Sequence, residues 1–60
     1  MSNKIVNEML AENLKKQAAC QKRADQYAKL NCPAVAQKHQ LKANSYNRVI
    51  EILKAKLVQE

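Results

Sequence analysis

The stretch that decides the fold is LNCPAV, residues 30–35, which holds the only proline of a chain without glycine. Inside a helix a proline removes one backbone hydrogen bond and clashes with the preceding turn, at about 3 kcal/mol. It also disfavours helical angles at the residue before it, here Cys32. At the first position of a helix its fixed φ is favourable. We therefore predict that Pro33 starts a second helix, with Asn31 in the left-handed conformation that ends the first. One long kinked helix is the alternative.

The segments on both sides of this stretch have the composition of helices. Alanine, lysine, leucine, glutamine and glutamate dominate the 60 residues, and all are good helix formers. Apolar residues recur at helical spacing in both segments, more strongly in the second. We predict a first helix over about 3–30 that is capped by Ser2 or Asn3, a turn at 31–32, and a second helix over about 33–58.

A turn this short makes the two helices antiparallel, so we predict one all-α helical hairpin spanning 1–60. Facing residue numbers should sum to roughly 64, which places Leu14 opposite Ile50. One seam rarely stabilises so short a chain. We therefore expect two hairpins to form a four-helix bundle as a homodimer; a monomer that completes its core on a different protein is the alternative. The expected seam or dimer-core residues are Val6, Leu10, Leu14, Tyr46, Val49, Ile50, Leu53 and Leu57.

The formal charge of +6 is concentrated in the middle of the chain. Residues 15–48 carry a net charge of +7, whereas residues 1–14 carry −1 and residues 49–60 carry 0. Basic residues recur every seven positions and form two adjacent rows along the first helix. This pattern is compatible with a solvated face, with docking of an acidic protein, or with contacts to nucleic-acid phosphates. The candidate binding residues are Lys15, Lys16, Lys22, Arg23, Lys29, Lys38, Lys42 and Arg48.

The chain offers few groups for catalysis or metal binding. His39 is the only histidine, and the absence of glycine excludes a glycine-rich phosphate loop. Glu8 and Glu12 lie one helical turn apart on the polar side, as solvated charges commonly do. Cys20 and Cys32 are twelve residues apart, which matches no zinc pattern. We expect no enzyme activity, no cofactor and no metal. A metal site shared across a dimer and a redox role for Cys32 are weaker alternatives.

The sequence also predicts where in the cell the protein is found. Polar residues interrupt the first 14 positions, so we expect no signal peptide. No apolar run approaches the roughly 18 residues of a membrane span. An amphipathic helix lying on a membrane surface is disfavoured because the chain has no tryptophan or phenylalanine. We expect a soluble cytoplasmic protein with both cysteines reduced.

Two stretches, NEMLAENLKKQAACQKRA (7–24) and YAKLNCPAVAQKHQLKANSYNRVIEIL (27–53), resemble the small helical accessory proteins encoded in the early exo–xis region of lambda-like bacteriophages. The resemblance covers nearly the whole chain and assigns no binding or catalytic residue. It implies a non-enzymatic early phage protein that helps shift the bacterial host cell toward lytic growth. We therefore expect a regulatory adaptor that binds a host or phage protein. The alternative is a helical bundle that binds nucleic acid through the lysine-rich face of the first helix.

Overall fold

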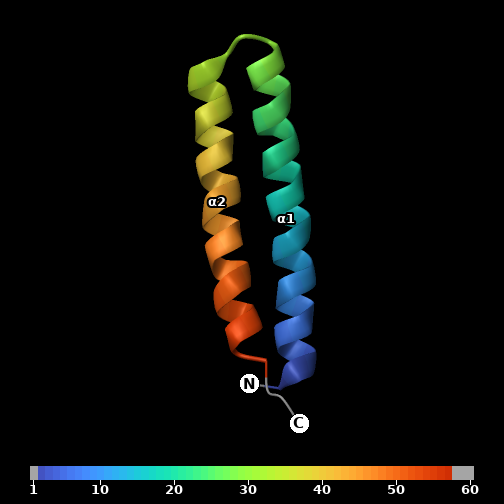
Figure 1. Ribbon diagram of the computed structural model, residues 1–60. Coiled ribbons are helices and arrows are strands. Elements are labelled where there is room, and N and C mark those ends of the chain that lie inside the picture. The colour runs from blue at the N-terminus through green and yellow to red at the C-terminus, as the bar shows by residue number, and fades with distance from the viewer. Residues whose placement is uncertain (1, 58–60) are drawn as a thin grey trace.

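The computed structural model describes residues 2–57 and shows two helices, α1 (Asn3–Lys29) and α2 (Pro33–Ala55), with no strand in that range. The helices lie side by side and antiparallel, so the start of α1 and the end of α2 meet at one end of the molecule (Figure 1). The hairpin measures 48 × 14 × 12 Å. The predicted all-α helical hairpin is confirmed.

Local backbone chemistry sets the ends of α1. The Ser2 Oγ accepts a hydrogen bond from the Ile5 amide at 3.4 Å, which identifies Ser2 as the cap. At the other end Asn31 has φ 57°, the left-handed conformation predicted for it. The Asn31 amide donates to the Ala28 carbonyl at 3.2 Å, and the Cys32 amide donates to the Tyr27 carbonyl at 2.9 Å. These two bonds form a complete Schellman motif, which closes α1 without a glycine.

Pro33 is the first residue of α2, as predicted. Cys32 has φ −113° and ψ 71°, outside the helical region, and its carbonyl accepts the hydrogen bond of the Ala36 amide at 2.9 Å. The proline therefore divides two helices and does not kink one.

The second helix ends at Ala55, earlier than the predicted end near Val58, which lies outside the described residues. The amides of Lys56 and Leu57 bond to carbonyls three residues back, at 3.0 and 3.3 Å. This tighter bonding closes the last turn of the helix.

The seam between the helices follows a strict alternation of three- and four-residue steps. Because this is the 3.5-residue spacing of a coiled coil, the burial pattern of the hairpin is that of a short antiparallel coiled coil. Every residue on the pattern is buried or half-buried. The seam residues of α1 are Asn3, Val6, Leu10, Asn13, Gln17, Cys20, Ala24 and Tyr27, and those from Pro33 onward are Ala36, His39, Ala43, Tyr46, Ile50, Leu53 and Leu57.

The aliphatic part of the seam lies at the end where the helix termini meet, as predicted. It consists of Val6, Leu10, Ile50 and Leu53, with Leu57 packed against them. Toward the turn the fully buried residues are Ala24 and Ala43. The seam therefore has a strong apolar half near the helix ends and a half of small and polar side chains near the turn.

Leu14 and Val49, which we expected in the seam or dimer core, do not lie in the seam. They are 48% and 39% exposed, and neither belongs to the buried cluster. The reason is geometric: Asn13 and Ile50 occupy the seam positions, and a neighbour in sequence lies about 100° away around the helix. The predicted pairing of Leu14 with Ile50 is thus corrected, because Ile50 packs with the cluster that contains Leu10.

Candidate functional site

A network of side-chain amides crosses the seam near the middle of the hairpin. Gln21 and Gln40 exchange two hydrogen bonds, with Nε2–Oε1 distances of 2.8 and 2.9 Å. Gln21 also donates to Asp25 at 3.2 Å, and Gln40 donates to Asn44 at 3.0 Å. Both hydrogens of each glutamine amide are therefore used. Because the pair is half-buried and reciprocal, it stabilises one alignment of α1 against α2.

The coiled-coil geometry divides the rest of the surface. In antiparallel helices, side chains one position before a seam residue lie on one side of the seam in both helices, and those one position after lie on the other. We call the second group the amide flank, because it contains Gln21 and Gln40. We call the first group the basic–apolar flank. It contains Ile5, Met9, Glu12, Lys16, Ala19, Arg23, Gln26 and Leu30, together with Val35, Lys38, Lys42, Ser45, Val49, Ile52 and Lys56.

The two flanks differ in charge. The basic–apolar flank has five cations and one carboxylate, a formal charge of +4. Among residues 2–57 the amide flank has two cations and two carboxylates, a formal charge of 0, contributed by Lys4, Asp25, Glu51 and Lys54. The positive charge near the seam is therefore on one side of the molecule.

The flanks also differ in apolar exposure. Eight large apolar side chains are exposed among residues 2–57, and six of them lie on the basic–apolar flank. Of the remaining two, Leu14 lies on the amide flank and Leu41 on the outer surface of α2. Four of the six form a terminal patch near the helix ends, and two form a tip patch at the turn. The terminal patch is Ile5, Met9, Val49 and Ile52; the tip patch is Leu30 and Val35.

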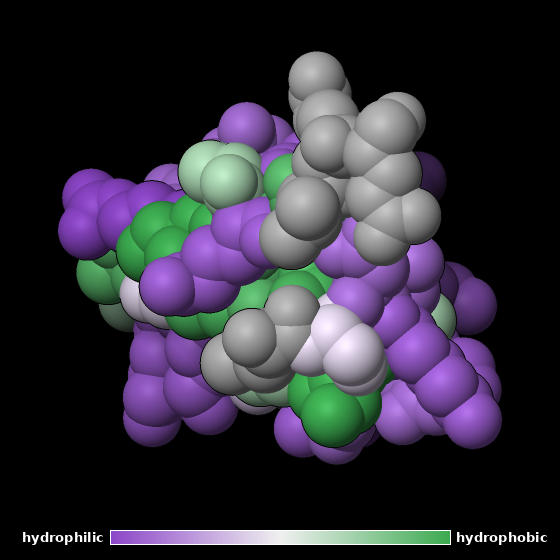
Figure 2. Space-filling view, turned by 90° about the horizontal axis from the view of Figure 1, so that it is seen from below, coloured by the Kyte–Doolittle hydropathy of each residue, from purple (hydrophilic) through white to green (hydrophobic). Residues whose placement is uncertain are grey.

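Figure 2 looks at the end of the hairpin where the helix termini meet. Apolar surface there emerges between projecting hydrophilic side chains and is not fully covered by them. The terminal patch is consistent with this view, since its members are between 37% and 56% exposed.

The eight predicted basic residues are all exposed, but the structure separates them. Lys16 and Arg23 of α1 share the basic–apolar flank with Lys38 and Lys42 of α2, and we call these four the basic cluster. Along the helices, the cluster lies between the tip patch and the terminal patch. The other four point away from the seam, on the outer surfaces of the helices: Lys15, Lys22 and Lys29 of α1, and Arg48 of α2.

A small hollow lies within the basic cluster. Its lining is Ala19, Cys20 and Tyr46, with Lys16 and Arg23 beside them. The hollow exists because alanine and cysteine are short where the neighbouring basic side chains are long. The hollow cannot be predicted from the first helix alone, because Tyr46 of the other helix completes it.

Lys16 at the edge of this hollow is held by Glu12. Its Nζ lies 3.1 Å from the Glu12 Oε1, one helical turn away. The hydrogen bond to the Glu12 carboxylate, and the charge of that carboxylate, raise the pKa of Lys16 above the ordinary lysine value. Lys16 is therefore a cation throughout the physiological range.

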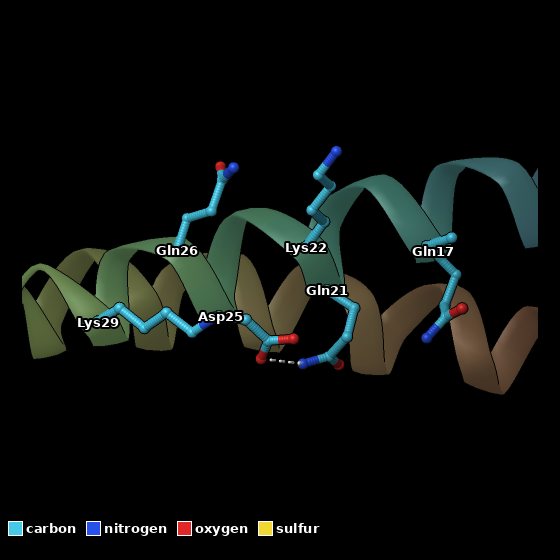
Figure 3. A pocket seen from close by; sticks show the side chains of 7 residues that line it. Gln17, Gln21, Lys22, Asp25, Gln26 and Lys29 are labelled. Atoms are coloured by element: carbon cyan, nitrogen blue, oxygen red, sulfur yellow. Dashed lines mark hydrogen bonds between the residues drawn. The ribbon is translucent and has the colours of Figure 1, made fainter.

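A second hollow runs along the outside of α1 (Figure 3). Figure 3 shows Lys22 and Gln26 projecting away from the seam, while the Gln21 amide is engaged by Asp25. One helix alone supplies this lining, so the hollow is a groove between solvated side chains. The lining is Gln17, Ala18, Gln21, Lys22, Asp25, Gln26 and Lys29.

Of the groups considered for chemistry, Cys20 lines the hollow in the basic cluster, whereas His39 and Cys32 line neither hollow. The ring of His39 stacks on that of Tyr27, with centroids 5.4 Å apart and planes 6° from parallel. Its Nδ1 is buried and makes no hydrogen bond within the described chain. Cys20 and Cys32 are free thiols. Among residues 2–57, no three histidine, cysteine or carboxylate side chains are grouped as a metal site requires.

No helix in the described range is both long and apolar enough to cross a membrane. Comparisons with protein-family models, with curated proteins and with solved structures find no match to this chain. The resemblance to early phage proteins is therefore a hypothesis.

Proposed function

We propose that this protein is a non-enzymatic adaptor that works by binding another protein. The observation that carries the proposal is that six of the eight large apolar side chains exposed among residues 2–57 lie on one flank. Exposed apolar patches rimmed by charged residues are typical of protein–protein interaction sites.

The proposal includes a homodimer that forms a four-helix bundle. The terminal patch is the surface that supports it, because Ile5, Met9, Val49 and Ile52 extend the apolar end of the seam outward. Two hairpins that pack these patches together, related by a twofold axis, bury apolar side chains from both helices of each copy. In that arrangement Val49 belongs to the dimer core, although it lies outside the seam of its own chain.

The biological setting we propose is early phage development. The support is the resemblance of 7–24 and 27–53 to the small helical proteins of the exo–xis region. On that basis the adaptor acts in the cytoplasm of a bacterial host, binds a host or phage protein, and promotes lytic development.

The test of the adaptor function is affinity capture from host lysate with the wild-type protein. We expect a reproducible protein partner. Capture of RNA or DNA without any reproducible protein would contradict the proposal.

The test of the dimer is light scattering on two matched variants. Ile52→Asp places a charge in the terminal patch, whereas Leu41→Asp places the same charge at an equally exposed site on the outer surface of α2; the two native side chains are 56% and 58% exposed. We expect a dimer mass for the wild type and for Leu41→Asp, and a monomer mass for Ile52→Asp. A stable wild-type monomer at high micromolar concentration refutes the dimer.

A nucleic-acid-binding function is favoured by one observation, the outer row of α1. Lys15, Lys22 and Lys29 are exposed and recur every seven residues, about 10 Å apart along the helix. Such a row would bind phosphates with an affinity that falls steeply with salt. Unchanged mobility of DNA and RNA at low salt with micromolar protein would exclude this function.

A further inference from the structure

The basic cluster and the tip patch occupy the half of the basic–apolar flank nearest the turn. Leu30 and Val35 are 69% and 39% exposed there, and Lys16, Arg23, Lys38 and Lys42 lie between them and the terminal patch. The hollow over Ala19, Cys20 and Tyr46 lies inside the cluster. This half thus combines exposed apolar side chains, a recess and four cations.

A second copy of this chain does not fit that half. In any twofold arrangement centred on the cluster, its cations oppose the same cations of the other copy. Like charges juxtaposed at an interface cost several kcal/mol and exclude wrong partners. The second copy is therefore restricted to the terminal patch, where the basic cluster does not have to be buried.

Nucleic acid fits it poorly as well. Apolar patches bound the basic cluster at both ends along the helices. A nucleic-acid backbone carries phosphates along its whole length, so its binding surface needs cations that continue beyond such a cluster. Single strands also need exposed aromatic rings for base stacking. The ring of Tyr27 is already stacked on His39, and Tyr46 is half-buried in the seam.

The surface matches an acidic helix. Between Leu30 and Lys16 on α1 lie about four helical turns, or roughly 21 Å, which a helix of about 14 residues spans. One apolar side chain of such a helix can enter the hollow between Lys16 and Arg23, as a knob enters a hole. Carboxylates one turn before and after that side chain then lie near the cations of the cluster.

We propose that the turn half of the basic–apolar flank binds an acidic amphipathic helix of another protein. Its carboxylates pair with Lys16, Arg23 and Lys42, and its apolar stripe covers the hollow and the tip patch. This inference rests on the proposed adaptor function and names the chemistry of the partner.

The experiment uses the full-length protein and three synthetic peptides of about 21 residues, a length that covers the half-flank with a turn to spare at each end. Each is an amphipathic helix with the same leucine stripe, and the residues beside the stripe in the central turns are glutamate, glutamine or lysine. Binding of labelled peptide is followed by fluorescence anisotropy at about 50 and about 300 mM NaCl, since the higher salt screens exposed charges over a shorter distance.

We expect the wild type to bind the glutamate peptide more tightly than the glutamine peptide, and more weakly at high salt. The double variant Lys16→Glu/Arg23→Glu should lose about tenfold or more in affinity, equivalent to 1.4 kcal/mol. It should also prefer the lysine peptide. The matched control is Lys15→Glu/Lys22→Glu, with the same charge change at the same spacing on the outer surface of α1, and it should bind the glutamate peptide as the wild type does.

Lys42→Glu is the second test variant, because it acts from α2 and lies apart from the Lys16–Glu12 ion pair. Circular dichroism and light scattering confirm that each variant keeps its helicity and mass. No binding of the glutamate peptide, equal binding of the glutamate and glutamine peptides, or an equal loss in the control variant overturns the inference. Tighter binding of duplex DNA or RNA that is lost in Lys16→Glu/Arg23→Glu also overturns it.

The inference and the adaptor function can fail separately. If the wild type captures a protein from lysate and Lys16→Glu/Arg23→Glu captures it equally well, the adaptor function stands and the inference fails. If the wild type captures no protein at all, the adaptor function fails, and the peptide assay alone decides whether this surface binds acidic helices.

Discussion

The amide pair of Gln21 and Gln40 gives the sharpest test of how the seam is aligned. We consider Gln21→Met, Gln40→Met and the double variant, because methionine keeps the length of glutamine and removes only the amide. Each single variant removes both reciprocal hydrogen bonds, of 2.8 and 2.9 Å, together with one exposed bond to Asp25 or to Asn44. At about 0.5–1 kcal/mol net for each half-buried bond, either single variant should lose about 1–2 kcal/mol of unfolding free energy.

The double variant should recover most of that loss. It leaves neither amide of this pair without its partner, and two methionine side chains can pack against each other beside the seam. We expect its unfolding free energy to lie within about 0.5 kcal/mol of the wild type, so that the coupling energy is about 1.5–2 kcal/mol or more. For a domain of this size, whose total stability is of the order of 3–9 kcal/mol, these differences are large.

The assay is urea unfolding followed by circular dichroism, at one fixed protein concentration because self-association raises apparent stability. Equal m-values across the series show that the same surface is exposed in each case. Gln37→Met is the control, since Gln37 is an exposed glutamine of α2, and it should change the stability little. Suppose that each single variant lowers the unfolding free energy by less than about 0.3 kcal/mol and that the two effects add. Water then solvates the two amides separately, and the pair does not fix the alignment of α1 against α2.

Four further predictions follow from local features. Asn31→Ala should cost about 1 kcal/mol at φ 57°, whereas Asn31→Gly should stabilise slightly, in urea unfolding. Pro33→Ala should keep the hairpin, since the Schellman motif remains. Dyes at positions 2 and 57 should stay close in energy-transfer measurements, whereas one continuous helix would separate them by about 80 Å. Leu53→Ala, at a site 4% exposed, should cost about 2–4 kcal/mol, and a loss under about 1 kcal/mol would place it outside the core. Glu12→Gln should lower the pKa of Lys16 in a side-chain NMR titration. Because folding raises this pKa, the ion pair stabilises the fold at pH values below the ordinary lysine pKa. That stabilisation is lost as the pH rises through the folded-state pKa of Lys16.

The features that were predicted correctly are those that neighbouring residues determine. Proline is disfavoured inside a helix, so Pro33 marks a helix start, and Asn31, two residues earlier, tolerates a left-handed backbone. Both effects act within one turn of chain, so they can be read without knowing what packs against them. The cap was predicted as Ser2 or Asn3, and the structure identifies Ser2, whose hydroxyl accepts a hydrogen bond from the Ile5 amide in the first turn.

The features that were missed depend on how the two helices face each other. On a single helical wheel Leu14 lies on the apolar side, and nothing in α1 alone shows that Asn13 takes the seam position. The choice is made across the seam, where Leu10 packs with Ile50 and Leu53, and Gln21 pairs with Gln40. With these pairs aligned, only the residues spaced alternately three and four positions apart lie in the seam. The apolar face seen on the helical wheel is broader than this seam, so Leu14 lies beside it.

The same geometry explains why a charge count could not separate the binding surfaces. Lys15 and Lys16 are adjacent in sequence, and so are Lys22 and Arg23, but adjacent residues of a helix point about 100° apart. Each pair is therefore divided, one member on the outer surface of α1 and the other beside the seam with cations of α2. The net charge of +7 over residues 15–48 counts the cations of both surfaces together. Only the surface beside the seam also has a recess and apolar neighbours. Charge reversal can therefore assign a function to either surface. Lys16→Glu/Arg23→Glu changes the charge beside the seam, and Lys15→Glu/Lys22→Glu makes the same change on the outer surface of α1.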